Sequence, residues 1–223
     1  MWKRALFLCV FALSIALLSA NLSGGNDKKA TEKDKTKDKF DPKYANTTYV
    51  PTADEVIYKM FDMAKVNEKD VIFDLGCGDN RILYMAAKKY GARGVGIEIN
   101  PDRVREAMDQ YEKFNGGKDF GKLLSLVEFR HGDALKVKDL KDATVVVMYM
   151  FPEFMDLWYP IAEKTLKPGT RIVSHDYSWT EAVKGWEPKE TANVKSSMRE
   201  NHKVIMWVVP EKKKTDKKKA AGE

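Results

Sequence analysis

Short apolar runs alternate with stretches of helical periodicity between residues 44 and 210. The clearest run covers residues 71–75, where Val71, Ile72 and Phe73 precede an acid and a leucine. Three consecutive apolar residues, two of them β-branched, are typical of a strand buried on both faces. Comparable runs predict strands near residues 94–98, 126–130, 144–150 and 170–174. Strands that alternate with helices predict an α/β fold with a doubly wound, largely parallel sheet.

The segments between these runs have apolar residues at helical spacing. The first contains Val56, Ile57, Met60, Phe61 and Ala64, and the sequence Thr52-Ala53-Asp54-Glu55 before it reads as a capping box. Further helices are expected over residues 81–90, from residue 101 onward, and up to residue 166. Residues 191–197 and 202–209 flank a short polar loop, which predicts an antiparallel hairpin at the end of the domain.

A glycine turn follows the first strand, in the order Asp74-Leu75-Gly76-Cys77-Gly78-Asp79-Asn80-Arg81. Glycines at this point let a ligand approach the backbone closely. The dinucleotide fingerprint needs a third small residue, and Arg81 stands there instead. The Asp74 carboxylate would repel a pyrophosphate but would pair with an ammonium group. These features favour S-adenosylmethionine, which carries an ammonium and a sulfonium but no phosphate.

Two more acids follow strands of the same sheet. Glu98 ends the second strand, where an acid hydrogen-bonds a ribose diol. Asp133 and Ala134 follow the third strand, where the acid would accept a hydrogen bond from an adenine amino group. The alternative is that these are ordinary strand-end turns. Cys77 has two interpretations, a small residue that fits a tight turn or a reactive thiol.

With the motifs Tyr49–Thr52, Asp74–Asp79 and Ser174–Asp176, the chain resembles a class I, seven-strand S-adenosylmethionine-dependent methyltransferase. Within that superfamily it resembles a bacterial group with an N-terminal signal segment, and more distantly the mitochondrial carrier and ATP-synthase-subunit lysine methyltransferases. The resemblance implies a Rossmann-like sheet of strand order 3-2-1-4-5-7-6, with the last strand antiparallel and helices on both faces. The usual Gly-Asp-Gly-Arg loop here has Asn80, a residue that tolerates the left-handed region.

The resemblance and the motifs together give a set of expected site residues, and the protein is expected to be a monomer. The expected cofactor-binding residues are Tyr49, Thr52, Asp74, Gly76, Cys77, Gly78, Asn80, Glu98, Ile99, Asp133, Ala134 and Tyr149. The expected catalytic residues are Tyr149, Glu153 and His175. No metal site is predicted.

The loop after the fourth strand is where this superfamily presents the methyl acceptor. It lacks the Asn/Asp-Pro-Pro sequence of many amine methyltransferases, and has the aromatic residues Tyr149, Phe151 and Phe154. These either form an apolar channel for a lysine stem or pack under the next helix. His175 is either a general base or a structural histidine. Three functions stay open: a protein-lysine methyltransferase near a membrane, a small-molecule O- or N-methyltransferase, and an exported cofactor-binding relic without activity.

The positive charge of the chain is concentrated in its ends. The 223 residues carry a net charge of +6, and the segments 1–4, 26–40 and 211–223 together carry +7. The net charge of the remaining residues is therefore close to −1. This charge does not predict a basic surface for binding a phosphate backbone, and no nucleic-acid partner is expected.

The first twenty residues read as a targeting segment. Lys3 and Arg4 precede an apolar run over residues 5–18, shorter than a comfortable membrane span. Residues 1–20 are thus a signal peptide or a membrane anchor, 21–43 a charged flexible linker, 44–210 the methyltransferase domain and 211–223 a disordered lysine-rich tail. The protein is either exported to the cell envelope or anchored with its domain in the cytoplasm, where residues 5–20 and the lysine-rich tails would associate with the membrane.

Overall fold

The computed structural model describes residues 48–114 and 120–211. The expected leader and linker, and the tail beyond Glu211, lie outside the described residues. Within the described part of the chain, no helix has the length and apolar character needed to cross a membrane.

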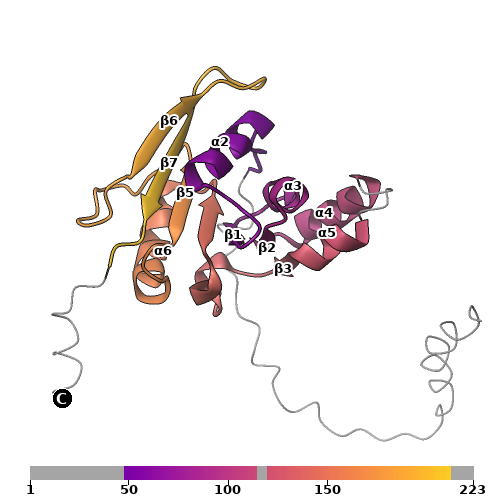
Figure 1. Cartoon of the computed structure of the whole chain (residues 1–223), viewed down its shortest axis with the longest axis horizontal. Helices are drawn as coiled ribbons and strands as arrows, with labels where there is room; N and C mark the ends of the chain where they lie inside the picture. Colours follow the sequence, from indigo (N-terminus) through magenta and orange to yellow (C-terminus); the bar gives the residue numbers. More distant parts are fainter. Residues whose placement is uncertain (1–47, 115–119, 212–223) are drawn as a thin grey trace, which may run out of the picture. The chain divides into compact units, whose positions relative to one another are not determined.

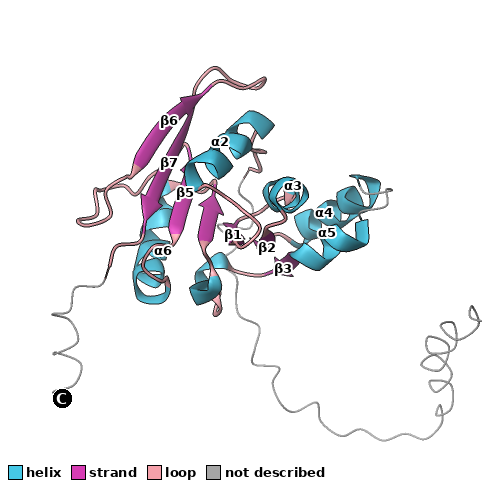
Figure 2. Ribbon diagram, viewed as in Figure 1, coloured by secondary structure: helices cyan, strands magenta, loops and turns pink. Residues whose placement is uncertain are grey.

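Helices and strands alternate along the described chain (Figures 1 and 2). The elements are α2 (Asp54–Ala64), β1 (Val71–Leu75), α3 (Arg81–Tyr90), β2 (Arg93–Glu98), α4 (Pro101–Phe114), α5 (Phe120–Leu126), β3 (Val127–His131), two 3₁₀ turns (Ala134–Lys136 and Leu140–Asp142), β4 (Val145–Met148), α6 (Pro152–Thr165), β5 (Arg171–His175), β6 (Glu190–Val194) and β7 (His202–Val208).

The strands form one seven-stranded sheet in the order β3-β2-β1-β4-β5-β7-β6. Strands β1 to β5 pair in parallel, whereas β7 runs antiparallel to both β5 and β6. The expected strand order and the antiparallel last strand are confirmed. Several boundaries differ from the sequence prediction, and β6 ends at Val194 rather than at residue 197. A helix, α5, occupies the residues just before β3, and β4 ends at Met148, which leaves Tyr149 and Met150 in the loop that follows.

Both faces of the sheet are buried, and alternate residues of each central strand enter opposite cores. Phe73 of β1 and Val146 of β4 pack with α6, while Ile72 and Val145 pack with α2 and α3. This two-sided burial explains why the central strands read as continuous apolar runs rather than as alternating ones. The expected apolar face of α2 is buried, as predicted.

The predicted capping box at the start of α2 is wrong. The N-cap residue is Ala53, and no side chain caps the helix. The Thr52 hydroxyl lies 3.2 Å from Nδ1 of His175 in β5, and Glu55 accepts a hydrogen bond from the backbone of Ser197. Long-range partners on β5 and on the β6–β7 connection therefore take both side chains away from the local motif, and Thr52 is tied to the carboxyl edge of the sheet.

Candidate functional site

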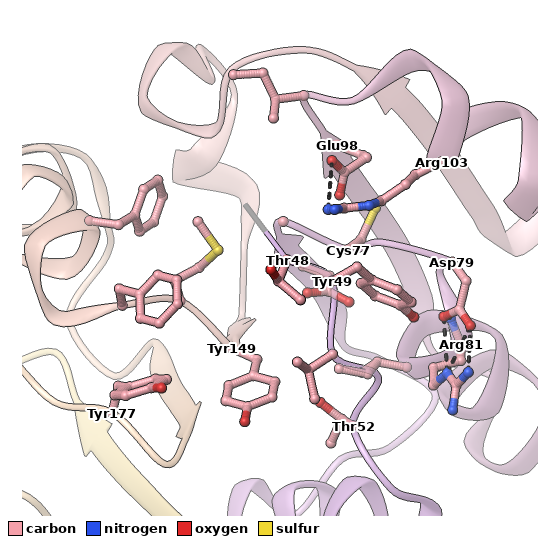
Figure 3. A pocket seen from close by; sticks show the side chains of 18 residues that line it. Thr48, Tyr49, Thr52, Cys77, Asp79, Arg81, Glu98, Arg103, Tyr149 and Tyr177 are labelled. Carbon is pink, nitrogen blue, oxygen red and sulfur yellow. Dashed lines mark hydrogen bonds and ion pairs between the residues drawn. The ribbon is translucent and has the colours of Figure 1, made fainter. Parts of the chain in front are cut away.

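A pocket opens at the carboxyl edge of the parallel strands, around the junction of β1, β2 and β4 (Figure 3). Its walls come from the segment 48–52 before α2, the glycine loop after β1, the end of β2, the first turn of α4, and the loop after β4. In open α/β sheets, ligands bind at this edge because the strand order reverses there and leaves a crevice.

Asp74 contributes a buried carboxylate without a partner to this pocket. Its side chain is 1% exposed, and Oδ2 has no hydrogen bond among the described residues. Burial raises the pKa of Asp74 well above its usual value, and the nearby charges of Glu98 and Asp79 raise it further. Such an oxygen is costly unless a donor or a positive group approaches it. The amino group of S-adenosylmethionine meets this requirement, so the residues present fit the expected cofactor.

Glu98 connects the end of β2 to the glycine loop. One carboxylate oxygen accepts a hydrogen bond from the Gly78 amide at 2.9 Å, and the other accepts one from the Asn100 amide at 2.9 Å. Arg103, from the first turn of α4, forms an ion pair with Glu98 at 3.8 Å. Each carboxylate oxygen accepts about two hydrogen bonds. Glu98 thus keeps acceptor capacity for the hydroxyls of a ribose while it holds the loop in place.

The glycine loop has the left-handed conformations that its sequence predicts. Gly76 has φ +78°, Gly78 has φ +55°, and Asn80 has φ 64°. The expectation that Asn80 replaces a glycine without loss of the turn is confirmed. The Asn80 side chain points toward β2, where a Cβ on Gly96 would lie 2.5 Å from its Oδ1 atom. Close contact between the loop and β2 therefore requires a glycine at position 96.

The segment before α2 lies over the glycine loop. A Cβ on Gly78 would lie 2.2 Å from the Tyr49 ring, so the ring packs directly on the loop backbone. The Arg103 guanidinium lies 5.1 Å from the centre of the same ring. Burial raises the pKa of the Tyr49 phenol, and the charge of Asp79 raises it further. Tyr49 is therefore a neutral aromatic side of the pocket at neutral pH, in contact with an arginine and with the backbone of the glycine turn.

The loop after β4 gives the pocket an apolar side. Tyr149 and Phe151 each face Tyr177, with ring centres 5.8 Å and 5.3 Å apart, and all three rings line the pocket with Met150 and Phe154. The Tyr149 hydroxyl donates a hydrogen bond to Asp176 at 3.1 Å. Burial and the charge of Asp176 raise the pKa of Tyr149 to about 12.

His175 lies behind the Tyr149 ring and is not part of the pocket lining. Its ring centre is 3.9 Å from that of Tyr149, and its side chain is buried. Burial lowers the pKa of His175 to about 4, because the charged form loses its hydration. A neutral imidazole with so low a proton affinity favours the structural interpretation of His175 over a general base.

The sequence-predicted site residues fall into two groups. Those that line the pocket are Tyr49, Thr52, Asp74, Gly76, Cys77, Glu98, Ile99 and Tyr149. Those that lie outside the lining are Gly78, Asn80, Asp133, Ala134, Glu153 and His175. Gly78 and Asn80 shape the glycine loop through their backbone. Glu153 is exposed in the first turn of α6.

Asp133 stands at the same sheet edge but serves a local turn. Its carboxylate accepts a hydrogen bond from the Leu135 amide at 2.9 Å, and it caps the 3₁₀ turn that begins at Ala134. The amide of Gly132, one residue earlier, donates to the Glu98 carbonyl at 2.9 Å, which places this turn beside the end of β2. Adenine recognition by Asp133 stays a prediction.

Burial also raises the pKa of the Cys77 thiol well above its usual value, and Asp74 and Glu98 raise it further. Reactivity requires the thiolate, which these surroundings disfavour. Cys77 therefore acts as a small residue in the turn, in agreement with the first of the two interpretations.

Sequence reasoning missed several pocket residues. Arg103 was not expected, although its position in the first turn of the helix after Glu98 allows it to reach back to the acid. Asp79 and Arg81 pair through their side chains at 2.6 Å and line the pocket beside Tyr49. His202 contacts His175, and Arg199 contacts Asp176. These contacts join residues that are distant in the sequence, so no local pattern predicts them.

Comparison with known proteins agrees with this geometry. The family described as the ANTKMT methyltransferase domain matches residues 74–190. A protein-lysine N-methyltransferase from Saccharolobus islandicus (strain REY15A) is 40% identical over 166 residues, which cover 74% of this chain and 95% of that protein.

Solved structures with the same fold include two informative relatives. An RNA methyltransferase from Salinibacter ruber, in complex with S-adenosyl-L-homocysteine, has a TM-score of 0.62 and 40% identity, covering 74% of this chain and 96% of that chain. A precorrin-6y C5,15-methyltransferase from Geobacter metallireducens GS-15 has a TM-score of 0.56 and 18% identity, covering 77% of this chain and 96% of that chain. The second likeness concerns the fold alone.

The fold and the pocket define an S-adenosylmethionine-dependent methyltransferase of the seven-strand class, as the sequence predicted. Within that class, the chain belongs to the ANTKMT methyltransferase domain family.

Proposed function

We propose that this protein transfers methyl groups to the side-chain nitrogen of lysine in a protein acceptor. The observation that carries this proposal is the apolar, aromatic side of the pocket, built by Tyr149, Phe151 and Tyr177 beside the acids of the cofactor site. A lysine stem is apolar, and its amine attacks only after it has lost a proton. Apolar walls favour the neutral form of an amine. The 40% identity to a protein named as a protein-lysine N-methyltransferase supports the same acceptor.

The chain's own residues have positioning roles in such a reaction. When bound, S-adenosylmethionine supplies an electrophilic methyl group on its sulfonium. Asp74 would hold the cofactor's amino group, Glu98 its ribose hydroxyls, and Tyr49 would cover it from the side of the glycine loop. The aromatic rings would shield the acceptor side from water once both reactants are bound. Holding the two reactants in line can supply about 7–11 kcal/mol of the barrier.

An RNA acceptor is the main competitor, since the relative from Salinibacter ruber is named as an RNA methyltransferase. The charge distribution of this chain does not favour it. Outside the segments 1–4, 26–40 and 211–223, the chain has a net charge close to −1. Nucleic-acid binding proteins generally neutralise several phosphates with a basic surface.

The acceptor class is tested with S-adenosylmethionine carrying a tritiated methyl group. The full chain is incubated with an extract of the host, and the products are separated into protein, RNA and small-molecule fractions before acid hydrolysis of the protein. We expect the label in methyllysine. Label in RNA that is sensitive to ribonuclease, or in small molecules only, would overturn the proposal. Asp74→Asn is the matched inactive control, because it removes the charge expected to hold the cofactor.

We further propose that residues 5–20 keep the domain at the cytoplasmic side of a membrane. S-adenosylmethionine is made in the cytoplasm, and lysines follow the apolar run closely, as the positive-inside rule requires of a cytoplasmic flank. Protease added to intact spheroplasts should leave the domain undigested until the membrane is permeabilised. Rapid digestion from outside would show that the domain is exported.

A further inference from the structure

A branched hydrogen-bond network lies behind the wall of the pocket and begins at Arg199, in the connection between β6 and β7. One guanidinium nitrogen of Arg199 lies 2.5 Å from Oδ2 of Asp176 and 3.0 Å from Nδ1 of His202. A guanidinium is always charged and can only donate hydrogen bonds. Both partners must therefore accept, which fixes Nδ1 of His202 as an unprotonated nitrogen.

The first branch runs through the two histidines. Nδ1 of His202 is 2.8 Å from Nε2 of His175, and two unprotonated nitrogens would repel each other at this distance. Nε2 of His175 must therefore carry the proton. It also lies 3.4 Å from the Asp176 carboxylate, a second acceptor that favours the same assignment. His202 in turn carries its proton on Nε2, 2.8 Å from the Ser196 hydroxyl.

This assignment extends to the pocket through Thr52. Burial lowers the pKa of His175 to about 4, and burial together with the charge of Arg199 lowers the pKa of His202. Asp176 and Glu55 are the acids that act against this shift in His202. Both rings are then neutral at pH 7, so Nδ1 of His175 is unprotonated. The Thr52 hydroxyl, 3.2 Å away, donates its hydrogen to that nitrogen.

The second branch runs through Asp176. Burial alone would raise the pKa of Asp176, but the Lys203 amide and Arg199 stabilise the carboxylate and hold the pKa below its usual value. The Tyr149 hydroxyl therefore donates to an ionised acceptor, at 3.1 Å. The two branches meet where the Tyr149 ring packs on His175, with ring centres 3.9 Å apart.

Both hydroxyls belong to residues that line the pocket (Figure 3), and both side chains contact His175. Their hydrogens are donated to His175 and Asp176, so toward any bound ligand their oxygens can only accept. We propose that Arg199, acting through Asp176 and the histidine pair, sets Thr52 and Tyr149 as two hydrogen-bond acceptors for the N–H groups of the attacking amine. This inference rests on the proposed function, because it requires an acceptor that has N–H groups.

Two fixed acceptors suit a neutral primary amine. Each N–H donates to one oxygen, which leaves the nitrogen lone pair free to point at the methyl carbon. An acceptor without hydrogen-bond donors would leave both oxygens unpaired, and a site built to pair a donor discriminates strongly against a ligand that lacks it. Thr52, which the sequence placed among the cofactor residues, thus belongs to the acceptor side, and Arg199 and His202 are positioning residues.

A cation site is the competing interpretation of the same residues. Ligand atoms of His175, Asp176 and His202 lie within 4.8 Å of one another. Arg199, however, already donates to Asp176 and to His202, and its positive charge opposes a metal ion there. The network therefore accounts for these groups without a metal.

The direction of the network is tested without any substrate. Nitrogen-15 NMR of the histidine rings in the full chain, at pH 7, distinguishes the two neutral tautomers and the imidazolium. The chain has three histidines, so His175→Gln and His202→Gln assign the signals, and the third belongs to His131. We expect both His175 and His202 to be neutral with the proton on Nε2. A proton on Nδ1 of either ring would overturn the proposal.

The effect on specificity is tested with Thr52→Val and Tyr149→Phe. We expect kcat/KM, measured over a dilution series of host-extract protein with tritiated cofactor, to fall about tenfold or more for each variant. The dissociation constant of S-adenosylhomocysteine, measured by calorimetry, should stay within about twofold, since a cofactor contact is not expected. Tyr58→Phe is the matched control, because Tyr58 is an exposed residue of α2 outside the pocket lining, and the change should leave both quantities nearly unchanged.

Arg199 provides a rescue test. Arg199→Met should lower kcat/KM in the same direction as Thr52→Val, and Arg199→Lys, which keeps a charged donor, should recover most of it. Thermal unfolding confirms that the variants are folded. If the wild type labels lysine but the Thr52 and Tyr149 variants match the wild type, the inference fails alone. If the wild type binds S-adenosylhomocysteine but labels no lysine, the proposed function fails, and the inference fails with it.

Discussion

The amide of Gly78 donates a hydrogen bond to the carboxylate of Glu98 across 2.9 Å, and this contact joins the glycine loop after β1 to the end of β2. The same acid is 2% exposed and also accepts from the Asn100 amide. The ends of β1 and β2, which form the cofactor side of the pocket, are therefore joined through Glu98. The residue predicted to bind the ribose hydroxyls also supports the glycine loop.

Glu98→Gln should weaken this unit. One of the two acceptor positions becomes an amide donor that faces a backbone N–H, so a buried donor loses its partner. We expect a loss of about 1–3 kcal/mol in the free energy of unfolding, measured with urea, and weaker binding of S-adenosylhomocysteine. Glu106→Gln, an exposed acid on α4, is the control and should change neither quantity. Equal effects of the two substitutions would contradict the role assigned to Glu98.

Asp74→Asn should separate stability from binding. The substitution removes a buried, unpartnered carboxylate, so the protein without cofactor should unfold at a higher temperature. It also removes the charge that pairs with the cofactor's amino group, which should weaken S-adenosylmethionine binding by about tenfold to a hundredfold. Calorimetric titration and thermal unfolding measure the two effects. Asp102→Asn, at an exposed acid in the first turn of α4, should change neither the unfolding temperature nor the binding of the cofactor. Tight binding by Asp74→Asn would argue against the assigned contact.

The stability of variants at position 80 should depend on how well the new residue adopts the left-handed backbone conformation. Asn80 has φ 64°, and its buried Oδ1 atom has no partner among the described residues. Glycine adopts this conformation without a Cβ penalty, so Asn80→Gly should be more stable than Asn80→Ala by about 1 kcal/mol. Urea unfolding of the two variants gives the difference directly. Equal stabilities would mean that the loop leaves the left-handed region when the residue changes.

The stability of the fold should fall as the pH drops from about 6.5 toward about 4. His175 has a pKa of about 4 in the folded protein and an ordinary value of 6.5, so the unfolded chain binds more protons in this window. The contribution of neutral His175 to the free energy of unfolding is fully present above pH 6.5 and is on the order of 3 kcal/mol. His175→Gln should flatten the difference in unfolding free energy between pH 7 and pH 4.5. An unchanged slope in that variant would assign the effect to His202 or to the acids.

Sequence reasoning recovered what is local. The apolar runs gave the strands, because a strand buried on both faces leaves no polar position to interrupt it. The order Asp74-x-Gly-x-Gly gave the turn and its ligand class, because backbone conformation and charge at a strand end depend on neighbouring residues. The capping box failed for the complementary reason. Thr52 and Glu55 have the right spacing, but partners far along the chain compete for them.

By itself, the sequence determined a seven-strand α/β domain, a glycine loop that fits a positively charged nucleoside, and two acids at adjacent strand ends. Only the tertiary structure decided that Asp133 caps a turn, that His175 lies behind Tyr149, and that Arg199 and His202 connect to the pocket wall. The physical reason is that hydrogen-bond direction and burial depend on which distant residues meet at the sheet edge, and spacing along the chain does not encode that meeting.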